Sequence, residues 1–231
     1  MTEQDDWTDE VSQYYAARAS VYDETAGYTD LAAEQLRAHI KSRYQEILAG
    51  HVVLEIACGT GYWTEVIGEA ANSVLAIDIH QSLISQAEER CARLPHVRFQ
   101  VADAYTLNGV PAGFTAAFGH WWWSHMPREK IPGFLRALHS KLVPGALVLF
   151  ADQLRYEWSA RRQDAGGNNL ETRTLPDGRS FEIVKNFPAE AELVNALQGI
   201  ADNIKYIEHP DEQSWDLTYN TRQSALLQEQ L

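Results

Sequence analysis

The chain has 231 residues, of which 45% are hydrophobic and 22% charged, a composition typical of a globular protein and unlike that of disordered or collagen-like chains. Its formal net charge of -13 repels a phosphate backbone, so we expect no nucleic-acid partner. Its two cysteines, Cys58 and Cys91, are too few for a disulfide framework or a cysteine-built metal site, and we expect no bound metal.

The first fifty residues predict helices. Hydrophobic residues recur at helical spacing between Thr29, which can cap a helix, and Gly50, which can end one. We therefore expect a helical lid over residues 1–50. The N-terminus is acidic and lacks the features of a signal peptide, and no apolar run approaches the roughly 20 residues of a membrane helix. These features predict a cytoplasmic protein without a membrane partner, and they leave its oligomeric state open.

Strands and helices alternate in the next hundred residues. Short apolar runs predict strands over 51–56, 73–79, 97–101, 114–119 and 146–151. Helical spacing predicts helices over 62–71 and 82–93, and a third that Pro127 opens and Gly145 ends. This alternation predicts an α/β fold with a parallel sheet, helices on both faces and a binding crevice at the carboxyl ends of the strands.

The last third departs from this alternation. A turn signal at residues 176–178 separates two strand-like segments and predicts a hairpin insertion near 171–187. The further predicted elements are a helix over 188–200 and strands over 203–207 and 215–220, which are close enough for an antiparallel pair. Because nothing resembles a linker, we predict one domain over residues 1–231, with its core in 51–231.

A glycine turn follows the first predicted strand. The strand contains Glu55, and Gly59 and Gly61 lie between its end and the next helix. Glycines at such a turn allow the backbone to approach a ligand closely. By itself the turn is a weak signal, because dinucleotide-binding proteins and flavoproteins share it.

Two further acidic residues follow the next two strands. Asp78 closes the second strand, and Asp103 follows the third. At the second strand a carboxylate can accept hydrogen bonds from both ribose hydroxyls, and after the third one can accept from an adenine amine. Together with Glu55, these residues favour an adenosyl ligand in one crevice.

In these residues the sequence resembles the class I S-adenosylmethionine-dependent methyltransferases, whose first motif is Glu-x-Gly-x-Gly-x-Gly. Ala57 stands at the first glycine of that motif. The resemblance implies a Rossmann-like, mostly parallel sheet of seven strands in the order 3-2-1-4-5-7-6, with the last strand antiparallel and helices on both faces. It also implies that S-adenosyl-L-methionine is the cofactor.

The resemblance further implies roles for individual residues. Asp78 would hold the ribose hydroxyls, Ile79 would pack on adenine and Asp103 would accept a hydrogen bond from its edge. The residues expected at the cofactor come from the N-terminal helix, the glycine turn and the ends of the second to fourth strands: Tyr14, Tyr22, Glu55, Ala57, Gly59, Thr60, Gly61, Asp78, Ile79, Asp103, Ala104 and His120.

An NAD-binding domain is the nearest competing interpretation of these motifs. The third glycine of its pattern falls at Thr64, and Glu55 is unusual beside a pyrophosphate. Asp103 would also repel an anionic cofactor, whereas acidic surroundings suit a positively charged sulfonium.

The segment after the fourth strand occupies the position that contacts cofactor and acceptor in this family. His125 is the candidate general base, because imidazole titrates near neutrality, and the alternative is a histidine that bonds the following helix. The residues expected at the acceptor are Trp121, Trp122, Trp158 and Arg161. The segment lacks both the Asn/Asp-Pro-Pro-aromatic motif of amide-directed members and a nucleophilic cysteine, which argues against nucleic-acid substrates.

We therefore expect methyl transfer by in-line displacement to O, N or S of a small molecule. Tryptophan walls suit a flat aromatic or heteroaromatic acceptor, and Arg161 or Arg162 would hold an acidic one. Two alternatives stay open. One is a protein that binds S-adenosylmethionine without methyl transfer, and the other is a protein methyltransferase.

Overall fold

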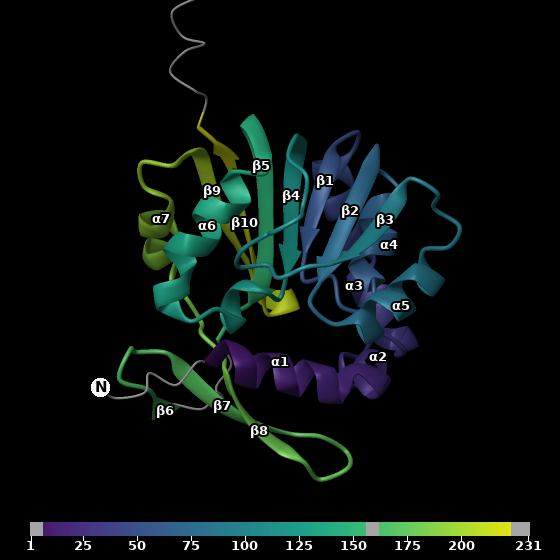
Figure 1. Cartoon of the computed structure of the whole chain (residues 1–231), viewed down its shortest axis with the longest axis vertical. Helices are drawn as coiled ribbons and strands as arrows, with labels where there is room; N and C mark the ends of the chain where they lie inside the picture. Colours follow the sequence, from purple (N-terminus) through teal and green to yellow (C-terminus); the bar gives the residue numbers. More distant parts are fainter. Residues whose placement is uncertain (1–6, 156–161, 223–231) are drawn as a thin grey trace, which may run out of the picture.

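The computed structural model describes residues 7–155 and 162–222, and its centre is a seven-stranded sheet in the order β3-β2-β1-β4-β5-β10-β9 (Figure 1). The strands are β1 (Val52–Ile56), β2 (Ser73–Asp78), β3 (Val97–Val101), β4 (Phe114–His120), β5 (Leu142–Gln153), β9 (Ala201–His209) and β10 (Ser214–Thr221). The strands from β3 to β5 pair in parallel, whereas β10 is antiparallel to β5 and β9. The predicted strand order and the antiparallel last strand are confirmed.

Helices cover both faces of this sheet. The helices of the described residues are α1 (Trp7–Arg18), α2 (Tyr22–Thr25), α3 (Leu31–Leu48), α4 (Tyr62–Gly68), α5 (Gln81–Arg90), α6 (Ile131–His139) and α7 (Glu190–Leu197), with short 3-10 helices η1 (Ala19–Val21), η2 (Trp123–His125), η3 (Arg128–Lys130) and η4 (Pro210–Glu212). Phe134 of α6 and Leu193 of α7 belong to the hydrophobic cluster on one face, and Tyr44 of α3 and Ile67 of α4 to that on the other. Across the described part of the chain, no helix combines the length and apolarity needed to cross a membrane.

The central strands are apolar because both of their faces are covered. In β1, Leu54 and Ile56 belong to the cluster under α6 and α7, whereas Val53 belongs to the cluster under α3 and α4. All three side chains are fully buried. Side chains alternate between the faces of a strand, so a strand enclosed on both sides has a continuous apolar run instead of an alternating one.

The predicted boundary between α6 and β5 is wrong. Helical spacing extends the predicted helix to Gly145, but α6 ends at His139 and β5 begins at Leu142. Leu142 pairs with Phe114 of β4 in the parallel sheet. Apolar residues at this point fit either element, and pairing with the neighbouring strand decides between them.

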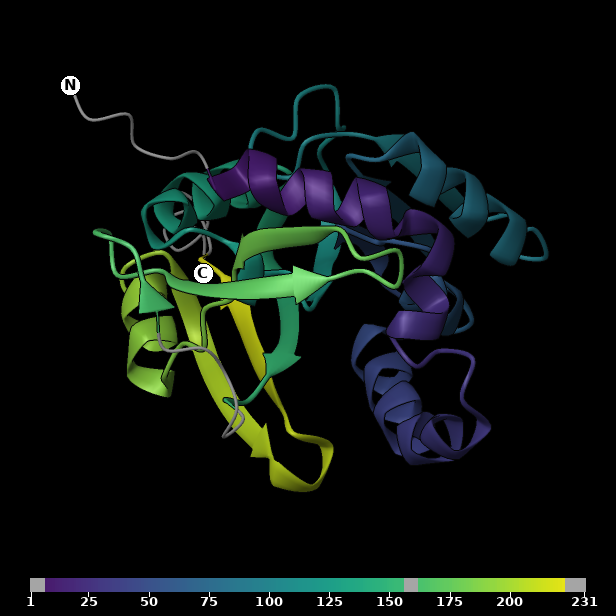
Figure 2. The ribbon, with the colours of Figure 1, turned by 90° about the horizontal axis from the view of Figure 1, so that it is seen from below.

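A second sheet of three strands lies beside α1. It consists of β6 (Arg162–Gln163), β7 (Asn169–Thr174) and β8 (Ser180–Val184), in antiparallel order. β7 and β8 form a hairpin in the region where the sequence predicts one, whereas β6 has no sequence signal of its own. Tyr14 of α1 packs edge-to-face on Phe181 of β8, with centroids 5.8 Å apart, and the two elements run side by side in Figure 2. Helix α1 is thereby held between the two sheets (Figure 1).

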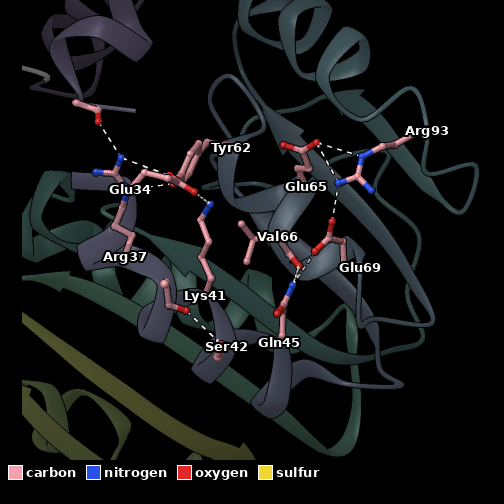
Figure 3. A network of polar contacts seen from close by, with 12 residues as sticks. Glu34, Arg37, Lys41, Ser42, Gln45, Tyr62, Glu65, Val66, Glu69 and Arg93 are labelled. Atoms are coloured by element: carbon pink, nitrogen blue, oxygen red, sulfur yellow. Dashed lines mark hydrogen bonds and ion pairs between the residues drawn. The ribbon is translucent and has the colours of Figure 1, made fainter. Parts of the chain in front are cut away.

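A polar network ties α3 to the first residue of α4 (Figure 3). Tyr62 donates its hydroxyl hydrogen to Glu34 Oε2 at 2.5 Å and accepts a hydrogen bond from Arg37 Nε at 3.0 Å. Lys41 pairs with the same glutamate, and the ring of Tyr28 stacks on Tyr62 at 4.0 Å. Because Tyr62 directly follows the glycine turn, these contacts fix the N-terminal helices against that turn.

Candidate active site

A cavity of about 230 Å³ lies at the carboxyl ends of the parallel strands, beneath α1. Its walls come from α1, the glycine turn and the segments that follow β2, β3 and β4. The sequence-predicted residues that line it are Tyr22, Ala57, Gly59, Asp78, Ile79, Asp103, Ala104, His120, Trp121, Trp122 and His125. The structure therefore brings together residues that lie more than a hundred positions apart in the sequence, from Tyr22 to His125.

The glycine turn is bonded to the end of β2. Ala57 at the start of the turn has a φ of 53°, a left-handed conformation that alanine rarely adopts. The Gly59 N–H donates to Asp78 Oδ2 at 3.0 Å. A non-glycine residue held in this region stores backbone strain, and such strain is frequent at ligand sites.

Gly61 ends the turn in close contact with α5, and we predict that its replacement destabilises the fold. At its φ of +77°, a Cβ would lie 2.7 Å from Ala87 Cβ. Gly61→Ala is expected to lower the free energy of unfolding by roughly 2–5 kcal/mol in denaturant titration, through backbone strain and overpacking. The matched control is Gly178→Ala, which has a φ of +87° but open space around it and is expected to cost only about 1–2 kcal/mol. Equal losses in the two variants would contradict crowding at α5.

Asp78 is buried at the end of β2. Its Oδ2 accepts a hydrogen bond from the Gly59 N–H and its Oδ1 accepts one from the His80 N–H, both at 3.0 Å. Burial raises the pKa of Asp78, and the two backbone N–H groups oppose that rise because they favour the carboxylate. Each carboxylate oxygen has a second lone pair, so the side chain can also accept bonds from two ligand hydroxyls.

Apolar side chains of the cavity wall suit a flat ring. Ile79 has 49% of its surface exposed although it is large and apolar, and it lines the cavity. Tyr105 and Trp122 lie nearby, with ring centroids 5.2 Å apart. Asp103 accepts a hydrogen bond from the Tyr105 N–H at 2.8 Å, which fixes its carboxylate at this wall. Tyr105 was not among the predicted site residues. Its position two residues after Asp103 is the sequence feature that could have indicated it.

Glu55 lies behind the glycine turn, next to the cavity. It borders a small space that is also lined by Tyr22, Ala57 and His120 of the cavity wall. Its side chain is 2% exposed, and within the described residues its Oε2 has no hydrogen-bond partner. Burial raises the pKa of Glu55 to about 8. A buried carboxyl oxygen that lacks a hydrogen-bond partner beside a cavity suits a cationic group of a ligand.

Other predicted site residues lie outside this cavity. Thr60 donates to Asp23 Oδ1 at 2.5 Å and supports the turn from the side of α2. Tyr14 packs on Phe181 and does not line this cavity. Trp158 and Arg161 fall outside the described residues.

His125 and Tyr15 form a hydrogen-bonded pair at the edge of the cavity. The His125 Nδ1 lies 2.9 Å from the Val184 carbonyl oxygen, so Nδ1 must have the proton. Nε2 is then the acceptor for the Tyr15 hydroxyl, at 2.9 Å. Burial, and then the charge of Lys185, lower the pKa of His125 well below its ordinary value, so the imidazole is neutral near pH 7. The family resemblance implied roles for Tyr14 and Tyr22 but not for Tyr15.

A second cavity of about 320 Å³ adjoins the first. Tyr15, Trp121 and His125 line both cavities and therefore form the boundary between them. Trp121 is held there with a φ of 55°, and its N–H donates to the Ala151 carbonyl oxygen at 2.8 Å. Two ligands that meet at this boundary would have their reacting atoms beside the Tyr15–His125 pair.

Comparisons with known proteins are consistent with this geometry. Residues 53–145 match the family model of a methyltransferase domain. The DhpI–SAH complex is similar with a TM-score of 0.74 and 31% identity, over 93% of this chain and 96% of that chain. The DhpI–SAM–HEP complex gives a TM-score of 0.75 and 30% identity, over 94% and 99% of the two chains.

A curated relative matches a shorter segment. Phosphoethanolamine N-methyltransferase 1 of Caenorhabditis elegans is 31% identical over 83 residues. That alignment covers 36% of this chain and 18% of the relative. The similarity to the DhpI complexes, by contrast, extends over nearly the whole of both chains.

Proposed function

Because this chain belongs to the class I S-adenosylmethionine-dependent methyltransferases, we propose that it transfers the methyl group of S-adenosylmethionine to O, N or S of a small molecule. The observation that supports this most strongly is the shared boundary of the two cavities. One cavity has the groups that an adenosyl ligand needs, and the other adjoins it at Tyr15, Trp121 and His125.

The residues of the first cavity fit the cofactor. Asp78 would accept bonds from the ribose hydroxyls, Ile79 would pack on adenine and Asp103 would accept from its amine. When bound, S-adenosylmethionine supplies an electrophilic methyl on a positively charged sulfur. The side chains around it need only align the acceptor and exclude water, and alignment of this kind contributes about 7–11 kcal/mol.

The Tyr15–His125 pair is placed to handle the proton of the acceptor. An acceptor O–H or N–H at the boundary would donate to the Tyr15 oxygen, whose own hydrogen already points to His125 Nε2. Loss of the acceptor proton would then pass a proton to Tyr15 and one from Tyr15 to Nε2. This extends the predicted role of His125 as the general base and adds Tyr15 as the group that touches the acceptor.

We predict that cofactor binding releases a proton from Glu55. With a pKa of about 8, this carboxyl is mostly protonated at pH 7, and a cationic ligand group nearby would lower its pKa. Binding should therefore release up to about one proton per cofactor, seen in calorimetric titrations as an enthalpy that depends on the ionisation enthalpy of the buffer. Glu55→Gln has no proton to release and should lose that buffer dependence. A dependence of the same size in both proteins would contradict the assignment.

The proposal favours a small-molecule acceptor over a protein. The second cavity, of about 320 Å³, lies between α1 and the β7–β8 hairpin, and residues of both elements line it, so its size suits a small molecule. An aromatic or heteroaromatic acceptor remains a prediction, which rests on the tryptophan side chains at the site, among them Trp121 at the boundary of the two cavities.

A label-transfer assay tests the proposed function. The full chain is incubated with methyl-labelled S-adenosylmethionine and a panel of phenols, heterocycles, amines and organic acids. Label in a small-molecule product supports the proposal. Label that stays in the cofactor indicates binding without transfer, and label on protein indicates a protein methyltransferase, so either result would overturn it.

A further inference from the structure

Three basic side chains meet in the second cavity, although the chain has a net charge of -13. Arg18 comes from α1, Arg173 from β7 and Lys185 directly follows β8. Among the described residues, no aspartate or glutamate lines this cavity. The first cavity has the opposite character, because Asp78 and Asp103 line it. The two halves of the site therefore differ in electrostatic sign.

Two of these cations are held in place by partners behind the wall. Lys185 is 2% exposed, and its Nζ donates to Ser124 Oγ at 2.8 Å and lies 3.6 Å from Asp152 Oδ1. Arg173 pairs with Glu171 at 2.5 Å. Burying an ammonium group costs free energy, and a buried ion pair is often no more stabilising than apolar residues of similar volume. The presence of Lys185 at the cavity wall therefore suggests a role in binding.

Arg18 is positioned by different contacts. Its Nε donates to Thr25 Oγ1 at 2.7 Å, and its guanidinium lies 4.6 Å from the ring centroid of Tyr22. The hydrogen bond uses one of five N–H donors. Asp152 thus balances the charge of Lys185, and Glu171 balances that of Arg173. The charge of Arg18 remains and gives the described part of the cavity a net positive charge.

We propose that the second cavity is a subsite for an acidic group of the methyl acceptor, a carboxylate or a phosphoryl group, held by Arg18, Arg173 and Lys185. The inference rests on the proposed function. An acidic group in this cavity places the remainder of the acceptor at the boundary, beside Tyr15 and His125. Guanidinium groups bind such anions through paired N–H donors, and these charge-assisted hydrogen bonds are stronger than those between neutral groups.

The effect of these three cations on the pKa of His125 is consistent with their placement around the second cavity. Lys185, Arg173 and Arg18 each lower the pKa of His125, after the larger effect of burial. The positive potential of the cavity therefore extends to the boundary where the two ligands would meet. A negative charge bound in the cavity would offset that potential beside the proposed base.

This assignment differs from the one that the sequence suggests for an acidic acceptor. Arg162 is exposed on β6 and pairs with Glu182, and Arg161 lies outside the described residues. The basic residues of the subsite were not singled out, because they come from three segments that only the docking of the hairpin against α1 brings together.

Calorimetric titration of the full chain saturated with S-adenosylhomocysteine tests the subsite. The probes are inorganic phosphate and benzoate, with benzamide as the uncharged counterpart of benzoate. The principal variant is Arg18→Gln, because Arg18 is partly exposed at the end of α1 and its loss leaves no buried acid unpaired. Arg173→Gln is the second variant, and Arg179→Gln at the hairpin tip, where Arg179 pairs with Asp177 outside the cavity, is the matched control.

The subsite predicts that phosphate or benzoate binds and that benzamide binds at least about 10-fold more weakly than benzoate. Arg18→Gln should weaken anion binding by at least about 10-fold, and Arg179→Gln should leave it unchanged. A preference for one anion identifies the acidic group. Equal binding of benzoate and benzamide, no anion binding, or equal affinities in Arg18→Gln and Arg179→Gln would overturn the inference. Binding of S-adenosylhomocysteine is measured in the same sample, so failure of the cofactor site is recognised separately.

Discussion

Replacing Asp78 with alanine is expected to weaken the binding of S-adenosylmethionine by at least about 100-fold. The carboxylate is positioned by the N–H groups of Gly59 and His80, and its remaining lone pairs face the cavity. Two hydrogen bonds from ribose hydroxyls to a charged acceptor each contribute about 1.5–3 kcal/mol. Calorimetric titration measures the loss, and circular dichroism checks that the variant keeps its fold.

Two further variants make this result specific. Asp78→Asn keeps the shape of the side chain and one acceptor oxygen, so its loss of affinity should be intermediate. Asp177→Ala removes a carboxylate at the exposed hairpin tip, where it pairs with Arg179, and should leave the affinity unchanged. Unchanged affinity in Asp78→Ala would remove the ribose assignment.

Replacing His125 with alanine is expected to lower kcat by about 100- to 10,000-fold and to change the affinity for the cofactor far less. Its Nε2 is the acceptor for the Tyr15 hydroxyl, and both residues lie at the boundary of the cavities. The measurement uses the acceptor found by label transfer, with kcat and the Kd of S-adenosylhomocysteine determined separately. A fully active variant would exclude the base role.

A double-mutant cycle tests whether the pair acts as a unit. Tyr15→Phe should lower kcat to a similar extent, and the double variant should be no slower than the slower single variant. The chain offers a matched control, because His139 Nε2 and the Tyr219 hydroxyl also form a bond of 2.9 Å, and neither residue lines the two cavities. His139→Ala and Tyr219→Phe should leave kcat unchanged. Additive losses at Tyr15 and His125 would show that they act independently.

The sequence predicted the part of the site that depends on strand ends. Asp78 ends one parallel strand and Asp103 follows the next, and the carboxyl ends of both strands share one edge of the sheet, so their proximity follows from local patterns alone. The glycine turn was predictable for the same reason. The end of α6 was not predictable, because Leu142 fits either a helix or a strand by its apolar character. Its pairing with Phe114 of β4 assigns it to the strand.

The acceptor side depends on contacts that local patterns do not specify. Tyr14 and Tyr15 are neighbours in one helix, yet Tyr14 packs on Phe181 whereas Tyr15 bonds to His125, and the docking of α1 determines which of them faces the site. The basic wall likewise requires Arg18 to meet Lys185 across 167 positions, through the docking of the hairpin on α1. Long-range packing of this kind has no periodic signal in the sequence.

The most direct test of the account is a crystal structure of the full chain with S-adenosylhomocysteine. We predict that its ribose hydroxyls bond to the Asp78 carboxylate, that its adenine lies on Ile79, and that its sulfur lies at the boundary formed by Tyr15, Trp121 and His125. A ribose held elsewhere, or a sulfur directed away from the second cavity, would contradict the proposed alignment of cofactor and acceptor.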